Sequence, residues 1–241
     1  RGYQIKAFML KHTEHKEIII ADCDVLYAED PTVILKDPNY LRTGTYFFRD
    51  FEGHQPKNQK EYDNRIIFVR SILPTRSPLF PKEWDYIYDG VYRLQKHRWY
   101  YQEAGTVFLN KDIVGQEVID NIYYLNKDHE KTYQGVLGDK ETFWLACVMA
   151  NKPFYMNHPS GRNCFMDKSK ISYAEAGKSR VNVLTHLYKG RYLFSQKGFA
   201  LLKPNNERPL ATIIDNISRL NNLDDIDKVQ EALNHKRAAL V

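Results

Sequence analysis

Apolar and polar positions alternate along the chain in a way that predicts a mixture of helices and strands. Residues 3–12 place Ile5, Phe8 and Met9 at helical spacing, which predicts an amphipathic helix leading into the apolar run 18–21. Because that run is apolar at every position, it predicts a strand covered on both faces, of the kind found in the middle of an α/β sheet. Further strands are predicted at 44–48, 102–110 and 183–188.

The second half of the chain adds helices to this pattern. Residues 111–126 carry Ile113, Val118 and Ile122 at helical spacing, and a further helix is predicted at 140–150 with Asp139 as its N-cap. Residues 151–182 are expected to be irregular apart from the strand candidate that follows, and residues from 210 onward predict a helical tail. The fold class that follows is α/β, with a sheet flanked by helices.

Residues 51–100 depart from this regular pattern, because they are polar, aromatic and interrupted by prolines. A long irregular segment inside a compact domain is uncommon and is often functional. We expect this segment, which carries Trp84 and Trp99, to line the functional site.

Composition narrows the class of protein. The 241 residues are 43% hydrophobic and 27% charged, as in an ordinary globular domain. The net charge of +5 is scattered rather than gathered into a basic stripe, so no nucleic-acid partner is expected. No apolar run approaches the roughly 18 residues of a membrane span, so membrane contact is expected only through segments outside this chain.

Asp22 and Asp24 form the most informative pair, because they follow the apolar run at 18–21 directly. Open α/β sheets place ligands at the carboxyl ends of their strands. Mg²⁺ and Mn²⁺ prefer oxygen ligands and keep positions open for phosphate oxygens, so the pair indicates a site for a metal–diphosphate complex such as a nucleotide-sugar. The alternative is structural: Asp24 caps the following turn and Asp22 ends the strand.

Five blocks of sequence, in a fixed order, resemble the fungal Mnn-type α-mannosyltransferases of glycosyltransferase family 71, which have a GT-A fold. They are QIKAFMLKHTEHKEIIIADCDVLYAEDP, TGTYFFRD, QEAGTVFLNKD, GDKETFWLA and HLYKGRYLF. The chain departs from the family at Thr106, where Gln is usual, and at Ser195-Gln196, where a His-Arg pair is common. The family's opening nucleotide-binding segment precedes the point at which the resemblance begins.

The resemblance implies a GT-A-like domain at residues 1–205, a mixed sheet flanked by helices, with a C-terminal helical extension at 206–241. It implies transfer of a hexose, most simply mannose from GDP-mannose, to a glycan hydroxyl with retention of configuration. It also implies a Mn²⁺ or Mg²⁺ cofactor and a Golgi lumen location. With a glycan acceptor implied, we expect the segment 51–100 to form the acceptor-side wall, with Trp84 and Trp99 stacking on sugar rings.

The resemblance and the chemistry together select eight candidate site residues. Asp22, Asp24 and His186 are the expected metal ligands; Lys6, Asp22, Asp24, Glu103 and Gly105 are expected to bind the donor; and Asp139 and Glu141 are the expected catalytic residues. A cation there would neutralise the charge that develops on the departing diphosphate. Structural alternatives remain for several of them. Asp139 is an N-cap, Glu141 a first-turn residue favoured by the helix dipole, Gly105 a tight turn and His186 a hydrogen-bonded histidine near the surface.

Two other classes compete with a glycosyltransferase. A haloacid-dehalogenase-type phosphatase also places Asp-x-Asp after an apolar strand, but it would have Thr or Val at position 26, where this chain has Leu26. It would also need a late Asp-Asp strand end, and Asp224-Asp225 lies in the predicted helical tail. The other alternative is a non-catalytic carbohydrate-binding domain that has kept a GT-A-like fold.

Overall fold

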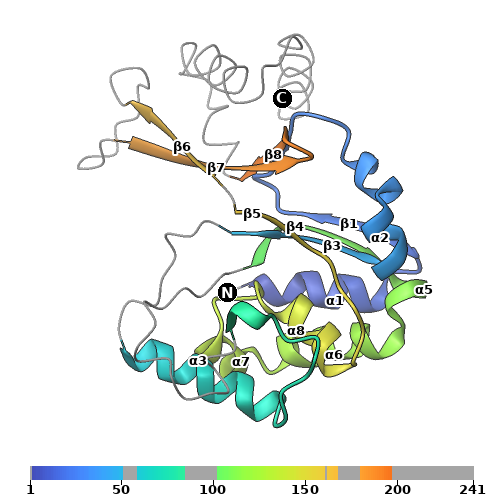
Figure 1. Cartoon of the computed structure of the whole chain (residues 1–241), viewed down its shortest axis with the longest axis vertical. Helices are drawn as coiled ribbons and strands as arrows, with labels where there is room; N and C mark the ends of the chain where they lie inside the picture. Colours follow the sequence, from blue (N-terminus) through green and yellow to red (C-terminus); the bar gives the residue numbers. More distant parts are fainter. Residues whose placement is uncertain (1, 51–58, 85–101, 161, 168–179, 197–241) are drawn as a thin grey trace. The chain divides into compact units, whose positions relative to one another are not determined.

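The computed structural model describes residues 2–50, 59–84, 102–160, 162–167 and 180–196. The chain divides into two compact units, one formed by residues 1–20 and 34–158 and the other by residues 21–33 and 159–241. Each unit has its own four-stranded sheet (Figure 1). The predicted boundary at residue 205 and the predicted helical extension lie outside the described residues.

The sheet of the first unit has the order β1 (Glu17–Ala21), β4 (Gln102–Asn110), β3 (Thr45–Arg49) and β5 (Met156–Ser160). The strands predicted at 18–21, 44–48 and 102–110 are therefore confirmed. The prediction that the first of them lies in the middle of the sheet is wrong. β1 is an edge strand in the described sheet, and its isoleucines are only half-buried. Ile18 and Ile20 pack against the helical core, which explains the apolar run without a central position.

Helices supply the rest of the first unit. They are α1 (Ile5–His12), α2 (Pro38–Thr43), α3 (Gln59–Ile72), α5 (Lys111–Val114), α6 (Gln116–Lys127), α7 (His129–Gly135) and α8 (Thr142–Met149), with short 3₁₀ turns at Gly2–Gln4, Pro31–Lys36 and Lys82–Trp84. In Figure 1, α1, α6 and α8 lie on one face of the sheet, with α3 and α7 beyond them. The α/β class and a mixed sheet flanked by helices are confirmed.

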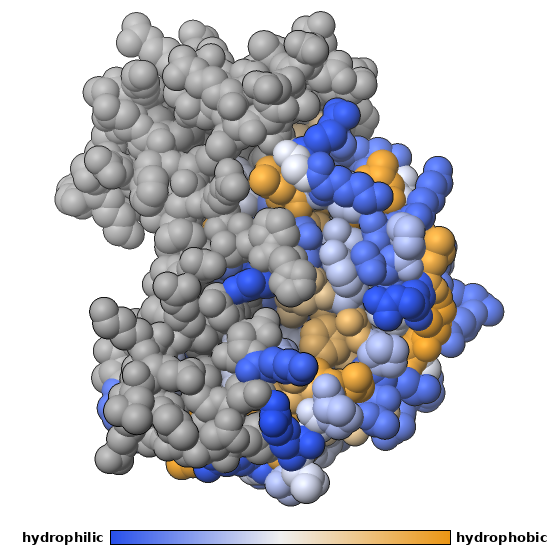
Figure 2. Space-filling model, in the orientation of Figure 1, coloured by the Kyte–Doolittle hydropathy of each residue, from blue (hydrophilic) through white to orange (hydrophobic). Residues whose placement is uncertain are grey.

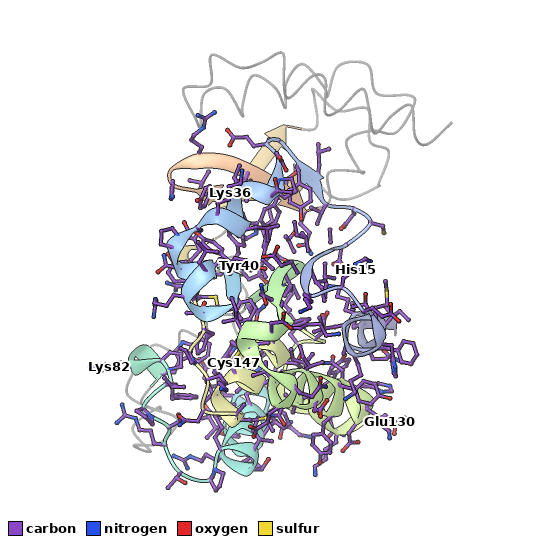
Figure 3. The ribbon with its side chains drawn as sticks, turned by 90° about the vertical axis from the view of Figure 1, so that its right-hand side faces the viewer. His15, Lys36, Tyr40, Lys82, Glu130 and Cys147 are labelled. Atoms are coloured by element: carbon purple, nitrogen blue, oxygen red, sulfur yellow. The ribbon has the colours of Figure 1, made fainter. Side chains whose placement is uncertain are left out.

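Both faces of β3 and β4 are buried. Phe47, Val107 and Leu109 face a core shared with the helices, whereas Phe48 and Phe108 contact each other on the opposite face with ring centroids 6.2 Å apart. Every residue of α8 from Thr142 to Val148 is buried, as expected of a helix that is apolar on all sides. Cys147 accordingly lies inside the helical layer, whereas Glu130 of α7 lies at its outer margin (Figure 3).

Regular elements occur where irregular chain was predicted. The 14-residue helix α3 lies within 51–100, and Trp84 is buried against Trp144 with ring centroids 4.9 Å apart. The prediction that Trp84 stacks on an acceptor sugar is therefore wrong, because its ring is part of the core; Trp99 lies outside the described residues. In the stretch 151–182, β5 and a further strand, β6 (Arg162–Asp167), replace the predicted irregular chain.

The second unit contains an antiparallel sheet of order β2 (Leu26–Tyr27), β8 (Arg191–Gln196), β7 (Arg180–Tyr188) and β6. The strand predicted at 183–188 is thus confirmed and is longer than predicted. Lys189 and Gly190 join β7 to β8 with φ of 49° and 81°. Two successive residues with positive φ match the right-handed twist of the paired strands, which is why a two-residue turn suffices here.

Hydrophobic and hydrophilic side chains are interspersed over the described part of the face in Figure 2. Within the described residues, none of the helices combines the length and the apolar character needed to cross a membrane.

Candidate functional site

The predicted site residues divide between the two units. The first unit holds Lys6, Glu103, Gly105, Asp139 and Glu141, and the second holds Asp22, Asp24 and His186.

The loop Gly138–Glu141, at the start of α8, is the centre of the group in the first unit. Gly138 has φ of +66°, and a Cβ added to it would lie 3.3 Å from the ring of Tyr3, so this position favours glycine on two counts. The Thr142 hydroxyl donates to the Asp139 carbonyl at 2.6 Å and accepts from the Asn126 side-chain amide at 2.9 Å. These bonds fix the loop against α6.

Asp139 is not a side-chain N-cap, which corrects the structural alternative predicted from the sequence. Helix α8 begins at Thr142, and the residue at its N-cap position, Glu141, makes no side-chain capping bond. The Asp139 carboxylate instead forms an ion pair with Lys6, at 3.1 Å from Oδ2 to Nζ. The two residues are only 4% and 9% exposed, so the pair is shielded from solvent.

Lys6 has a second partner on the sheet. Its ammonium donates a hydrogen bond of 2.6 Å to the carbonyl of Ala104. Ala104 lies where β3 and β4 fall out of register: Tyr46 opposes Phe108, but Phe48 opposes Glu103. This bulge in β4 releases backbone groups from the strand ladder, and Lys6 binds one of them.

Glu103 and Gly105 belong to the same bulge. The Gly105 amide donates to Oε1 of the Glu103 side chain at 2.5 Å, and Glu103 is fully buried. The alternative of a tight turn at Gly105 is wrong, because this residue lies inside the continuous strand β4.

Glu141 is also fully buried, and each carboxylate oxygen accepts a backbone hydrogen bond. Oε1 accepts from the Gln102 amide at 3.2 Å and Oε2 from the Leu137 amide at 3.4 Å. Burial raises the pKa of Glu141 to about 7, against the opposing effects of Arg65, Lys140 and these two amides. The carboxyl group therefore titrates near neutral pH.

Lys140 ties the loop to the end of β3. Its ammonium forms an ion pair with the fully buried side chain of Asp50. Burial alone would lower the pKa of Lys140, but three surrounding carboxylates outweigh burial and raise it. They belong to Glu103, Asp50 and Glu141.

Sequence reasoning missed four members of this buried group of charges and amides: Asp50, Arg65, Gln102 and Lys140. Gln102 links the group to α8, since its side-chain oxygen accepts from the Trp144 amide at 3.3 Å. Three of the four stand inside the quoted blocks, namely Asp50 at the end of TGTYFFRD, Gln102 at the start of QEAGTVFLNKD and Lys140 in GDKETFWLA. The available signal was a polar or charged residue next to a run of apolar residues, as for Asp50 after the strand 45–49.

In the second unit, Asp22 and Asp24 flank a turn in which the Asp22 carbonyl accepts from the Val25 amide at 3.0 Å. Both aspartates are half-buried, and Cys23 between them is exposed. Two carboxylates in a partly solvated turn suit Mg²⁺ or Mn²⁺, which are commonly held by one or two carboxylates together with water and substrate phosphates.

His186 lies in β7 and is only 1% exposed, with its ring stacked on Phe194 at a centroid distance of 4.6 Å. The side chain is not near the surface, so the alternative prediction of a histidine near the surface is wrong. Among the residues that the structure describes, no group of three or more His, Cys, Asp and Glu side chains is arranged to hold a metal. The assignment of His186 as a third ligand stays a prediction.

Comparison with known proteins gives the family. A family profile described as "Mannosyltransferase putative" matches residues 1–170. Similar curated proteins of Candida albicans (strain SC5314 / ATCC MYA-2876) are "Putative alpha-1,3-mannosyltransferase MNN12", which is 26% identical over 157 residues, and "Putative alpha-1,3-mannosyltransferase MNN15", which is 26% identical over 221 residues. These alignments cover 64% and 85% of this chain but only 18% and 28% of the relatives.

The chain therefore spans less than a third of the length of these curated relatives. The profile match extends over most of the chain and contains every predicted site residue except His186. The chain therefore belongs to the mannosyltransferase family that this profile describes.

Proposed function

We propose that this chain carries the core of a GT-A-like, metal-dependent mannosyltransferase. It transfers mannose from GDP-mannose to a hydroxyl of a glycan with retention of configuration. The observation that carries the proposal is the family match over residues 1–170, which contains both the Asp22–Asp24 turn and the Gly138–Glu141 loop. The names of these relatives, putative α-1,3-mannosyltransferases, support an α-1,3 linkage.

In this reaction the bond between the anomeric carbon and the diphosphate oxygen breaks, a bond to the acceptor oxygen forms, and the proton of the acceptor hydroxyl passes to the departing diphosphate. Asp22 and Asp24 would hold the cation, which supplies charge neutralisation for the leaving diphosphate. His186 is the proposed third ligand.

The residues of the first unit are proposed to act on the sugar side. Asp139 is the group that faces the reacting sugar, where a carboxylate steadies developing positive charge or orients a hydroxyl. Glu103 and Gly105 approach the donor from the bulge of β4. Glu141 accepts hydrogen bonds from the backbone amides of Gln102 and Leu137, so we assign it to setting the position of the loop that carries Asp139.

The whole protein is proposed to work in the Golgi lumen, where a glycan acceptor would be available. This location is supported by the fungal mannosyltransferase relatives.

Calorimetry of GDP binding in the presence of Mn²⁺ tests the metal assignment. Asp24→Ala should abolish Mn²⁺-dependent binding of GDP, because one of two cation ligands is lost. Glu14→Ala is the matched control, since it removes the same charge from an exposed position just before β1. Unchanged GDP affinity in Asp24→Ala would refute the assignment.

Alkylation of Cys23 gives an independent measurement of cation binding at the same site, because its exposed thiol lies between the two aspartates. Cys147 is buried, and burial raises its pKa to about 12, so its thiolate is scarce at neutral pH. In a Cys164→Ser background, Mn²⁺ with GDP should slow alkylation of Cys23. Asp24→Ala should remove this protection, and equal alkylation rates with and without Mn²⁺ and GDP would count against a cation at the turn.

A further inference from the structure

Lys6 makes two contacts that a cation reserved for a ligand would not need. Its ammonium reaches the Asp139 carboxylate at 3.1 Å and the Ala104 carbonyl at 2.6 Å. These partners come from the loop before α8 and from the bulge of β4, whereas Lys6 stands on α1. A single side chain therefore joins three elements of the first unit.

We propose that Lys6 is a positioning residue for Asp139 and does not bind the donor diphosphate directly. The inference rests on the proposed function, in which Asp139 acts on the sugar. Lys6 fixes the orientation of the Asp139 carboxylate and holds the β4 bulge against it.

The surroundings of the ammonium support this role. The Lys6 ammonium donates a hydrogen bond to the Ala104 carbonyl and forms an ion pair with the Asp139 carboxylate, so protein groups engage it on two sides. Lys6 is 9% exposed and Asp139 is 4% exposed, so both charges have lost most of their hydration and depend on each other for compensation. Moving this ammonium to a diphosphate would leave a buried carboxylate without its counter-charge.

The bulge gives the contact its geometry. The shift in register between Tyr46 and Phe48 takes Ala104 out of the regular ladder, and Glu103 satisfies the Gly105 amide with its own side chain. The Ala104 carbonyl is thereby presented to Lys6 at a fixed place on the sheet. The sheet therefore fixes the position of the Lys6 ammonium, and the ammonium in turn fixes the Asp139 carboxylate.

A double-mutant cycle separates positioning from donor binding. The variants are Lys6→Gln, Asp139→Asn and the two combined, and the readouts are kcat, KM for GDP-mannose and the calorimetric Kd for GDP with Mn²⁺. Gln keeps a hydrogen-bond donor near both acceptors but removes the charge. Lys11→Gln is the matched control, because Lys11 lies on the same helix and forms an exposed ion pair with Asp120.

Under the positioning role, Lys6→Gln lowers kcat by on the order of 10²-fold and leaves the Kd for GDP within about a factor of two. The double variant is then no slower than Asp139→Asn alone, because Lys6 acts through Asp139. A Kd for GDP weakened about tenfold in Lys6→Gln, or losses in kcat that multiply in the double variant, would overturn the proposal.

Two further outcomes are distinguishable. If Asp139→Asn keeps full turnover, both the proposed role of Asp139 and the positioning role of Lys6 are wrong. If Asp139→Asn is slow and the losses in kcat of the two single variants multiply in the double variant, only the positioning role of Lys6 is wrong. If Lys6→Gln does not fold, Lys6→Arg decides the question. Arg keeps the charge but moves it, so positioning predicts a lower kcat with unchanged GDP affinity, and a diphosphate-binding cation predicts that Arg is tolerated in both.

Discussion

Glu141 is the side chain whose surroundings change its acid–base behaviour most clearly. It is fully buried, its oxygens accept two backbone amides, and the cations of Arg65 and Lys140 are not enough to offset the loss of water. Its pKa therefore rises from the ordinary value of 4.5 to about 7.

This rise makes stability depend on pH in a definite direction. Between pH 4.5 and 7 the folded protein holds a proton on Glu141 that the unfolded chain has released, so the free energy of unfolding falls as pH rises. The loss through this group amounts to roughly 3 kcal/mol and is complete just above pH 7. Urea unfolding from pH 4 to 8 measures it as the difference between the parent and Glu141→Gln.

Glu141→Gln should gain stability relative to the parent as pH rises through this window, because a neutral amide pays no desolvation penalty for charge. Glu117→Gln removes a carboxylate from the exposed face of α6 and should show no comparable pH-dependent difference. A difference between parent and Glu141→Gln that stays constant from pH 4 to 8 would contradict the raised pKa.

Gly138 allows a second test at the residue scale. Gly138→Ala should destabilise the protein by about 1–3 kcal/mol, because a side chain at φ of +66° is strained and its Cβ would crowd Tyr3. Gly2→Ala is the control, since no atom lies within 4 Å of an added Cβ and its φ is not in the left-handed region. Equal thermal midpoints for the two variants would show that the Gly138 turn adapts without strain.

At the scale of elements, local patterns predicted many of the helices and strands but not their neighbours. The sequence predicts α1, β3, β4 and α6 because each carries its own apolar period. It does not predict that β1 is an edge strand, since this depends on pairing with β4 much later in the chain. Three consecutive isoleucines look alike in a central strand and in an edge strand that packs against helices.

Helix α3 was not predicted from the sequence, for a related reason. Its buried side chains include Tyr62 and Arg65, a phenol and a cation, beside apolar residues, so its core-facing side is of mixed polarity. The prolines near position 80 lie after this helix and do not interrupt it.

The residues of the candidate site were likewise predicted one by one from the sequence. The pairing of Lys6 with Asp139 joins distant parts of the chain, so only the fold reveals it.

A substitution of Trp84 tests whether this side chain belongs to the hydrophobic core. Trp84→Ala should destabilise the protein by about 3–5 kcal/mol, because the ring is 3% exposed and packs against Phe80 and Trp144. Tyr124→Ala, at an exposed aromatic on α6, should change the thermal midpoint little. If Trp84→Ala melts like the parent and selectively loses acceptor affinity, the sequence-based assignment to an acceptor wall would be restored.

Across the whole chain, the residues proposed for the reaction are divided between the two compact units. The carboxylates proposed to hold the cation lie in one, and the buried network around Asp139 lies in the other. Both lie within the part of the chain that matches the mannosyltransferase family. The proposed reaction needs both groups, so loss of either Asp24 or Asp139 should stop transfer, although only Asp24 should be needed for Mn²⁺-dependent binding of GDP.

Direct detection of the transfer product tests the central claim. The protein is incubated with GDP-mannose, Mn²⁺ and a mannoside acceptor, and the product is analysed by NMR for linkage and anomeric configuration. We predict one new α-linked mannose for each GDP released, and loss of the product when EDTA removes the cation. Release of GDP without a new mannosidic bond, or a product with inverted configuration, would contradict the account.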